Sequence, residues 1–262
     1  MRSAPGSGTV NEEIHSFGGP AHDQLENHMT NWKITWLGHS GFRIETSGQV
    51  LLIDPWLRGN PSFDEDRFDE AVAGATHVLL SHGHDDHAST VKEIAQKTGA
   101  TVIGIYDLIS WLGIENSVGV NKGGTVDLGA DGGAVAATFV HAVHSSSTMI
   151  DGKPVYLGGE GGWMIESGGE TLYFMGDTDV FADMEILEDL HHPVIGIVPI
   201  GGHFTMGPRR AAYACRKFFD FAAVIPCHYK TFPLLAQSAE DFEAELGGVR
   251  VVAPEVMETV EL

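Results

Sequence analysis

A short histidine-rich segment, residues 81–87, constrains this chain more than any other feature. It reads Ser-His-Gly-His-Asp-Asp-His, so three histidines and an aspartate occur in the spacing His-x-His-x-Asp-His. The apolar run at residues 76–81 predicts a buried strand, and a helix is predicted from Thr90 to about Lys97. A turn between a strand and a helix can direct several side chains to one point. Because imidazole and carboxylate are ligands of zinc and related metals, the segment predicts a metal site.

Composition restricts the class of protein. Of 262 residues, 43% are hydrophobic and 19% charged, which is enough for a sizeable core. The 33 glycines are typical of a loop-rich α/β protein with many tight turns. Fifteen lysines and arginines stand against 36 aspartates and glutamates, a formal charge of −21 that repels phosphate backbones and anionic membranes. We therefore expect a small-molecule substrate and no nucleic acid or membrane partner; a homo-oligomer stays open.

The cysteine content and the N-terminal residues indicate the cellular compartment and the domain boundaries. Cys215 and Cys227 are too few for a disulfide framework. The N-terminal residues lack the apolar core of a secretory signal, so a cytoplasmic protein is expected. Residues 1–30 are rich in Gly, Ser and Pro and predict a flexible tail, which leaves residues 31–262 as a single domain.

Apolar periodicity predicts two sheets packed together with helices outside, an α/β (α+β) fold. Short β-rich runs open the domain at residues 32–37, 42–46 and 50–54, and residues 125–175 alternate as an antiparallel sheet does. Strand and helix then alternate, with a strand at 194–200 and a helix that begins at Pro208. Thr90 and Glu93 match a capping box at the start of the helix after the histidine segment.

Seven segments between Ile34 and Pro233 carry a resemblance to a known family. They are ITWLGHSGFRIE, LLIDPWL, THVLLSHGHDDH, HAVHSSS, YFMGDTDVF, VPIGGHFTMGP and IPCHYKTFP. In this order they resemble the motifs of the metallo-β-lactamase superfamily, and more narrowly its small metal-dependent hydrolases of the ascorbate-6-phosphate-lactonase-like kind. The resemblance implies a four-layer αββα sandwich with a dinuclear metal site at one edge of the sheets.

The resemblance also implies a ligand set. One divalent metal ion would be held by His82, His84 and His144, and a second by Asp86, His87 and His228, with Asp177 bridging the two. Zinc is the expected metal, and manganese, iron or nickel would suit the same ligands. His144 is preferred to His141 because three serines follow it, as in the family.

Three further residues are expected to support the site. Asp54 resembles the family's buried aspartate that orients the metal-binding loop; an ordinary turn residue before Pro55 is the alternative. His39 and His203 are candidate catalytic residues, because either could donate to a carbonyl oxygen or a leaving group. For both, a hydrogen-bonded structural histidine is the alternative.

The function implied is that of a metal-dependent hydrolase. Two metals would lower the pKa of a shared water towards about 7, and the hydroxide would attack a small ester or lactone. Asp177 and Asp86 are the expected catalytic carboxylates, with Asp177 holding the nucleophile and passing on its proton. A phosphodiesterase that uses the same metal pair is the alternative. A non-catalytic metal-binding protein is the second alternative, although all seven ligand positions are filled, which favours an enzyme.

Overall fold

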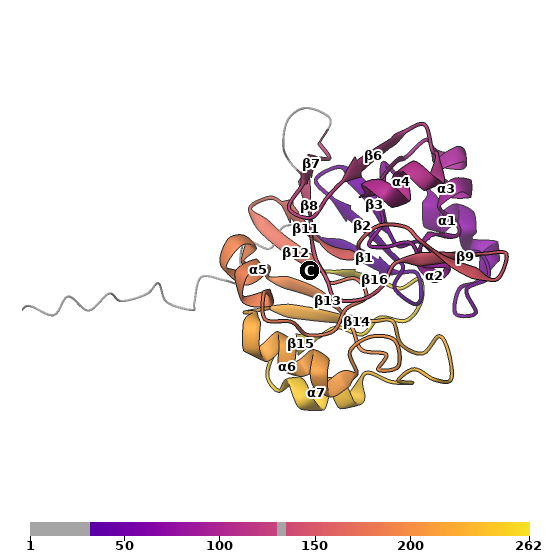
Figure 1. The fold of residues 1–262 in the computed structure, drawn as a ribbon. Coiled ribbons are helices and arrows are strands. Elements are labelled where there is room, and N and C mark those ends of the chain that lie inside the picture. The colour runs from indigo at the N-terminus through magenta and orange to yellow at the C-terminus, as the bar shows by residue number, and fades with distance from the viewer. Residues whose placement is uncertain (1–31, 130–134) are drawn as a thin grey trace, which may run out of the picture.

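The computed structural model describes residues 32–129 and 135–262, in which two seven-stranded sheets pack face to face (Figure 1). The predicted tail, residues 1–30, lies outside the described residues. The first sheet has the order β16 (Thr259–Glu261), β1 (Lys33–Trp36), β2 (Phe42–Thr46), β3 (Gln49–Ile53), β4 (His77–Leu79), β5 (Thr101–Ile105) and β6 (Ser117–Val120). Its strands are antiparallel from β16 to β3 and parallel from β3 to β6.

The second sheet repeats this division. Its order is β15 (Arg250–Val251), β14 (Ala223–Cys227), β13 (Ile195–Pro199), β12 (Glu170–Phe174), β11 (Gly161–Ser167), β8 (Val135–His141) and β7 (Thr125–Asp127). The strands from β12 to β15 are parallel, and those from β7 to β12 are antiparallel. A separate hairpin is formed by β9 (Ser147–Ile150) and β10 (Lys153–Tyr156).

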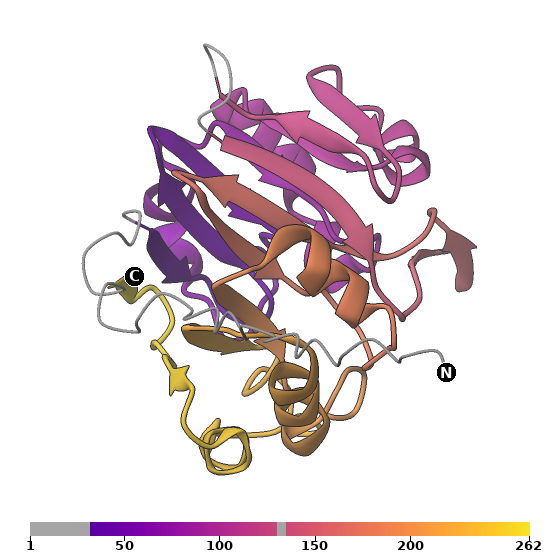
Figure 2. The ribbon, with the colours of Figure 1, turned by 90° about the vertical axis from the view of Figure 1, so that its left-hand side faces the viewer.

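Helices cover both outer faces. On the first sheet's side lie α1 (Phe68–Val72), α3 (Val91–Thr98) and α4 (Tyr106–Leu112), and on the second sheet's side lie α5 (Met184–His191), α6 (Pro208–Phe218) and α7 (Glu240–Leu246) (Figures 1 and 2). Short helical turns are η2 (Glu65–Arg67) and α2 (Asp85–Ala88). The predicted four-layer αββα sandwich is thus confirmed. No helix among the described residues has the length and apolar character needed to cross a membrane.

The core lies between the two sheets. Phe42 of β2 meets Phe174 of β12 edge to face, with ring centroids 6.2 Å apart, and both side chains are fully buried. Each such side chain contributes about 1.5–3 kcal/mol through burial. Strands β13 and β14 are buried at every position, which explains their unbroken apolar sequences. The buried side chains between the two sheets therefore hold the ends of the strands in fixed positions.

The capping box predicted at Thr90 is wrong. Thr90 has helical backbone angles and makes no capping hydrogen bond in α3. Its hydroxyl oxygen instead accepts from the backbone N–H groups of Leu57 and Arg58, at 3.0 and 3.1 Å, and Glu93 pairs with Arg58. The Thr90 hydroxyl does not cap the helix because the loop after β3 has buried N–H groups that need an acceptor.

Candidate metal centre

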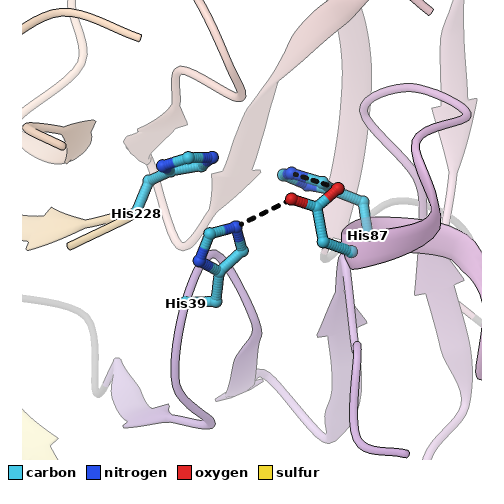
Figure 3. Close-up of side chains that lie close together, drawn as sticks. His39, His87 and His228 are labelled. Atoms are coloured by element: carbon cyan, nitrogen blue, oxygen red, sulfur yellow. Dashed lines mark hydrogen bonds and ion pairs between the residues drawn. The ribbon is translucent and has the colours of Figure 1, made fainter. Parts of the chain in front are cut away.

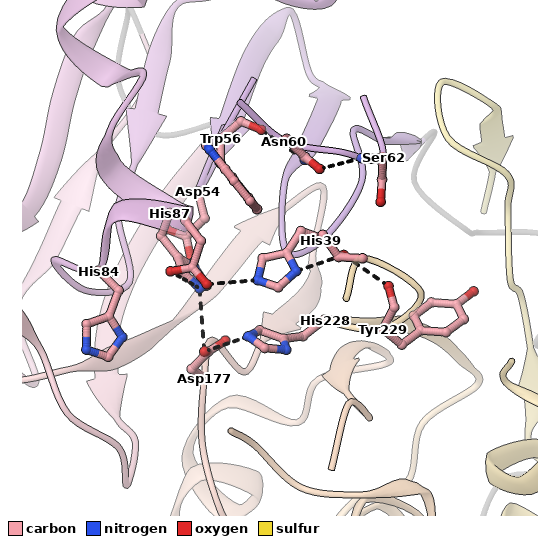
Figure 4. A network of polar contacts seen from close by, with 12 residues as sticks. His39, Asp54, Trp56, Asn60, Ser62, His84, His87, Asp177, His228 and Tyr229 are labelled. Atoms are coloured by element: carbon pink, nitrogen blue, oxygen red, sulfur yellow. Dashed lines mark hydrogen bonds and ion pairs between the residues drawn. The ribbon is translucent and has the colours of Figure 1, made fainter. Parts of the chain in front are cut away.

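The expected ligands all follow strand ends at one edge of the two sheets. After β4, His82 and His84 lie in the loop and Asp86 and His87 lie in α2. The other ligands follow strands of the second sheet: His144 follows β8, Asp177 follows β12 and His228 follows β14. Figure 4 shows His84, His87, Asp177 and His228 converging from both sheets. Residues far apart in the sequence therefore meet because their strands end side by side.

Two groups of possible ligand atoms contain the expected metal ligands other than Asp177, and a third joins Asp54 to His82 and His87. Donor atoms of His82, His84 and His144 lie within 4.8 Å of one another. Those of Asp86, His87, His228 and His39 form a second group within the same distance. The division matches the two sets expected from the sequence, with His39 added.

Asp177 lies between the two groups and is almost completely buried, with 2% of its side chain exposed. Its Oδ2 is 3.0 Å from His228 Nε2 and 3.4 Å from His87 Nε2 in one group. The same oxygen is 3.5 Å from His144 Nε2 in the other. One carboxylate therefore reaches both groups, as a bridging ligand must.

Gly176 lies in the turn after β12 that positions Asp177. Its φ is +65°, and a Cβ there would overlap the carbonyl oxygen of Gly161 and lie 3.1 Å from Ser81 Cβ. We expect Gly176→Ala to lower the free energy of unfolding by about 2–3 kcal/mol, measured by urea unfolding. Gly169→Ala is the matched control because Gly169 has φ +88° with nothing near its missing Cβ. Equal losses in the two variants would show that the close contact has no effect.

Asp54 orients one histidine from each group. The carboxylate can only accept, so His87 Nδ1–H donates to Oδ2 at 2.8 Å. Both the backbone N–H and the hydroxyl of Ser81 also donate to Asp54, the former at 2.8 Å. Since the Ser81 hydrogen is used in this way, His82 Nδ1–H donates to Ser81 Oγ at 2.8 Å. In both histidines Nδ1 is thus held by the protein, and Nε2 is the nitrogen directed towards the other ligands.

The site has buried atoms that a cation would satisfy. His87 Nε2 and Asp177 Oδ1 have no hydrogen-bond partner among the described residues. Burial alone would lower the pKa of His87, but the charges of Asp177 and Asp54 raise it well above the usual value. A positive charge is therefore favoured at this position, and a nitrogen and oxygen donor set suits a divalent metal. The residues present fit a metal site.

The first group is in its metal-binding form. Burial lowers the pKa of His84 and His144, and it lowers the pKa of His82 well below the usual value. Neutral imidazole is the form that binds metals, so these side chains require no deprotonation at neutral pH.

His39 lies inside the cluster and is fully buried. Burial lowers its pKa to about 4, so the ring is neutral near pH 7. Its Nε2 is 3.2 Å from Asp86 Oδ2 and its Nδ1 is 2.9 Å from Thr231 Oγ1, while its ring lies 4.0 Å from that of His228 (Figure 3). With both nitrogens engaged, His39 orients Asp86. Thr231, which has this contact, was not expected from the sequence.

Two other histidines stand outside the groups. His203 is exposed in the loop between β13 and α6, with its ring against Phe204, and it joins neither group within residues 32–129 and 135–262. His141 ends β8, where its Nδ1 is 3.0 Å from Lys122 Nζ. The structure thus brings His144, and not His141, to the ligands.

Backbone conformation singles out three residues of the site. His39, Asp54 and His228 have φ of 53°, 44° and 55°, in the left-handed region that ordinary residues seldom adopt. Each costs on the order of 1–3 kcal/mol and persists only where the surroundings hold it. Five other residues of the described chain share this conformation, so the three are notable here because their side chains belong to the site.

Comparison with known proteins agrees with this geometry. Residues 33–228 match the family model described as "Beta-lactamase superfamily domain". A relative in Dinoroseobacter shibae, "UPF0173 metal-dependent hydrolase", is 58% identical over 234 residues, which are 88% of this chain and 100% of the relative. The chain belongs to the metallo-β-lactamase superfamily. Within this superfamily it is a metal-dependent hydrolase.

Solved structures of the metallo-β-lactamase superfamily show the same architecture. Igni18, described as a novel metallo hydrolase from Ignicoccus hospitalis, has a TM-score of 0.78 and 31% identity, covering 89% of this chain and 99% of its own. The metallo-β-lactamase fold protein YhfI from Bacillus subtilis has a TM-score of 0.65 and 14% identity, covering 89% and 100%. The second likeness is one of fold alone.

Proposed function

We propose that this protein is a dinuclear hydrolase of small esters or lactones. The observation that carries the proposal is the position of Asp177, whose Oδ2 lies within 3.5 Å of histidines from both ligand groups. A carboxylate shared in this way is suited to two cations a few Å apart. Zinc is the metal that we propose, because the donors are mainly imidazole nitrogens.

The chemistry divides between the metals and the chain. Divalent ions held there would supply a water acidic enough to ionise near neutral pH and a Lewis acid for the carbonyl oxygen. Asp177 Oδ1, which has no hydrogen-bond partner among the described residues, would accept the proton of the nucleophile and return it to the leaving group. Asp86 would be held in position by His39, whose Nε2 lies 3.2 Å from Asp86 Oδ2.

Metal content is the first test. We expect about two equivalents per chain by plasma mass spectrometry on protein purified without chelator. His84→Ala and Asp177→Ala should each lower that number, because each removes a donor from one or both groups. His141→Ala is the matched control, since it removes a nearby histidine that pairs with Lys122, and should leave the content unchanged. Less than about half an equivalent, without uptake of added zinc or manganese, would contradict the proposal.

A further inference from the structure

An open cleft of about 730 Å³ lies beside the metal centre. His84 and Asp86, one from each ligand group, are part of its lining, so the cleft leads to both groups. Its size is typical of small-molecule sites, which span about 300–1,000 Å³. The cleft therefore bears on which substrate reaches the centre.

Two aromatic side chains, Trp56 and Phe232, form what we call the aromatic wall of the cleft. Their ring centroids are 6.0 Å apart, and both rings pack edge-on against His39, at 5.4 and 5.6 Å. Met149 and Phe204 also line the cleft, with 57% and 51% of their surfaces exposed. Apolar side chains left open beside a polar centre are suited to hold an apolar group by burial.

The charges of the cleft are all acidic. Its described lining includes Asp85 and Asp86 but no lysine or arginine. The nearby Arg58 is held by Glu65 and Glu93, at 3.2 and 2.8 Å. An anion would therefore lose hydration without gaining a protein cation, whereas an uncharged ligand would not bear this cost.

We propose that the cleft selects an uncharged substrate whose aromatic or aliphatic group lies on Trp56 and Phe232. The inference rests on the proposed function and narrows it. Aryl esters and apolar lactones fit, with the carbonyl group towards His84 and Asp86. Phosphodiesters, phosphorylated lactones and acids of the same shape bind less well, because they meet the carboxylate of Asp85 and no lysine or arginine in the described lining.

A matched pair of esters tests the selection by charge. Methyl 3-acetoxybenzoate and 3-acetoxybenzoate share an acetyl group and a ring but differ in charge. With the metal-loaded protein we expect kcat/KM to favour the uncharged ester by at least about 10-fold. Met149→Lys should reduce this preference, because it adds a cation to the lining. Equal or preferred hydrolysis of the anionic ester would overturn the inference and leave the proposed ester hydrolase intact. Preferred hydrolysis of bis(4-nitrophenyl) phosphate would overturn both.

Substitutions in the aromatic wall test where the apolar group lies. Trp56→Ala and Phe232→Ala should each raise KM for the uncharged ester by about 10-fold, with a smaller change in kcat. The control is Trp111→Ala, since Trp111 is 43% exposed on α4 and absent from the lining of this cleft. An unchanged KM in both wall variants would place the substrate elsewhere.

Binding to metal-free protein separates this inference from the proposed function. Methyl 3-hydroxybenzoate and 3-hydroxybenzoate contain no scissile acetyl group, and calorimetry measures their affinities directly. We expect the uncharged phenol to bind at least about 10-fold more tightly, and Trp56→Ala to remove most of that affinity. If this preference holds while the metal-loaded protein hydrolyses no ester, the proposed function fails and the cleft assignment stands. If the anion binds as well as the uncharged phenol, the cleft assignment fails.

Discussion

Replacing Asp177 by asparagine will lower kcat for ester hydrolysis on the order of 10³-fold without unfolding the protein. Asparagine retains the shape of the side chain but removes the charge that both ligand groups share. It also removes the basic carboxylate oxygen Oδ1, which has no hydrogen-bond partner in the part of the chain that the structure describes. The measurement is kcat at saturating metal and substrate, with circular dichroism to verify the fold.

The control for this variant is two residues away. Asp179 lies in the same loop, is 42% exposed and pairs with Arg210 at 2.9 Å. Such an exposed pair contributes little to stability, so Asp179→Asn should leave kcat nearly unchanged. A normal kcat in Asp177→Asn would contradict the proposed role of its carboxylate.

Asp54→Ala is expected to have the largest effect on stability. It leaves three buried donors without their acceptor, namely His87 Nδ1–H and the N–H and hydroxyl groups of Ser81. The free energy of unfolding of the metal-free protein should fall by about 3–5 kcal/mol, measured by urea unfolding. Metal affinity should fall by about 10–100-fold, because neither His82 nor His87 keeps its orientation.

Asp64→Ala is the comparison for Asp54→Ala. Asp64 accepts from Asp66 N–H at 3.1 Å at the start of η2, on the exposed surface. Loss of such a cap costs about 1 kcal/mol and should not change metal binding. If the two variants lose the same stability and neither loses metal, Asp54 is an ordinary turn residue.

The sequence could predict the parts of the site that are close together in the chain. Residues 81–87 place several donors in one turn between a strand and a helix, so their convergence follows from local structure. His144, Asp177 and His228 were assigned through the family resemblance alone. Their meeting depends on which strands become neighbours, and no local pattern encodes the order β14-β13-β12-β11-β8.

Long-range contacts also explain what was missed. Nothing around His39 in the sequence indicates that its ring would lie 4.0 Å from that of His228, because the contact joins the β1–β2 turn to the end of β14. Helix α4 was not expected, since it begins directly after β5 with no turn residue between them. The hairpin β9–β10 was included in an antiparallel sheet, whereas β8 and β11 pair directly, with His141 opposite Gly161.

The expected ligands are divided between the two sheets, so a bound metal would stabilise the packing of one sheet against the other. His82, His84, Asp86 and His87 belong to one layer, and His144, Asp177 and His228 to the other. A cation that takes donors from both acts as a removable cross-link, because it binds only the arrangement in which the layers are docked. Removal of the metal by a chelator would then weaken the packing between the two layers at the edge where the ligands meet.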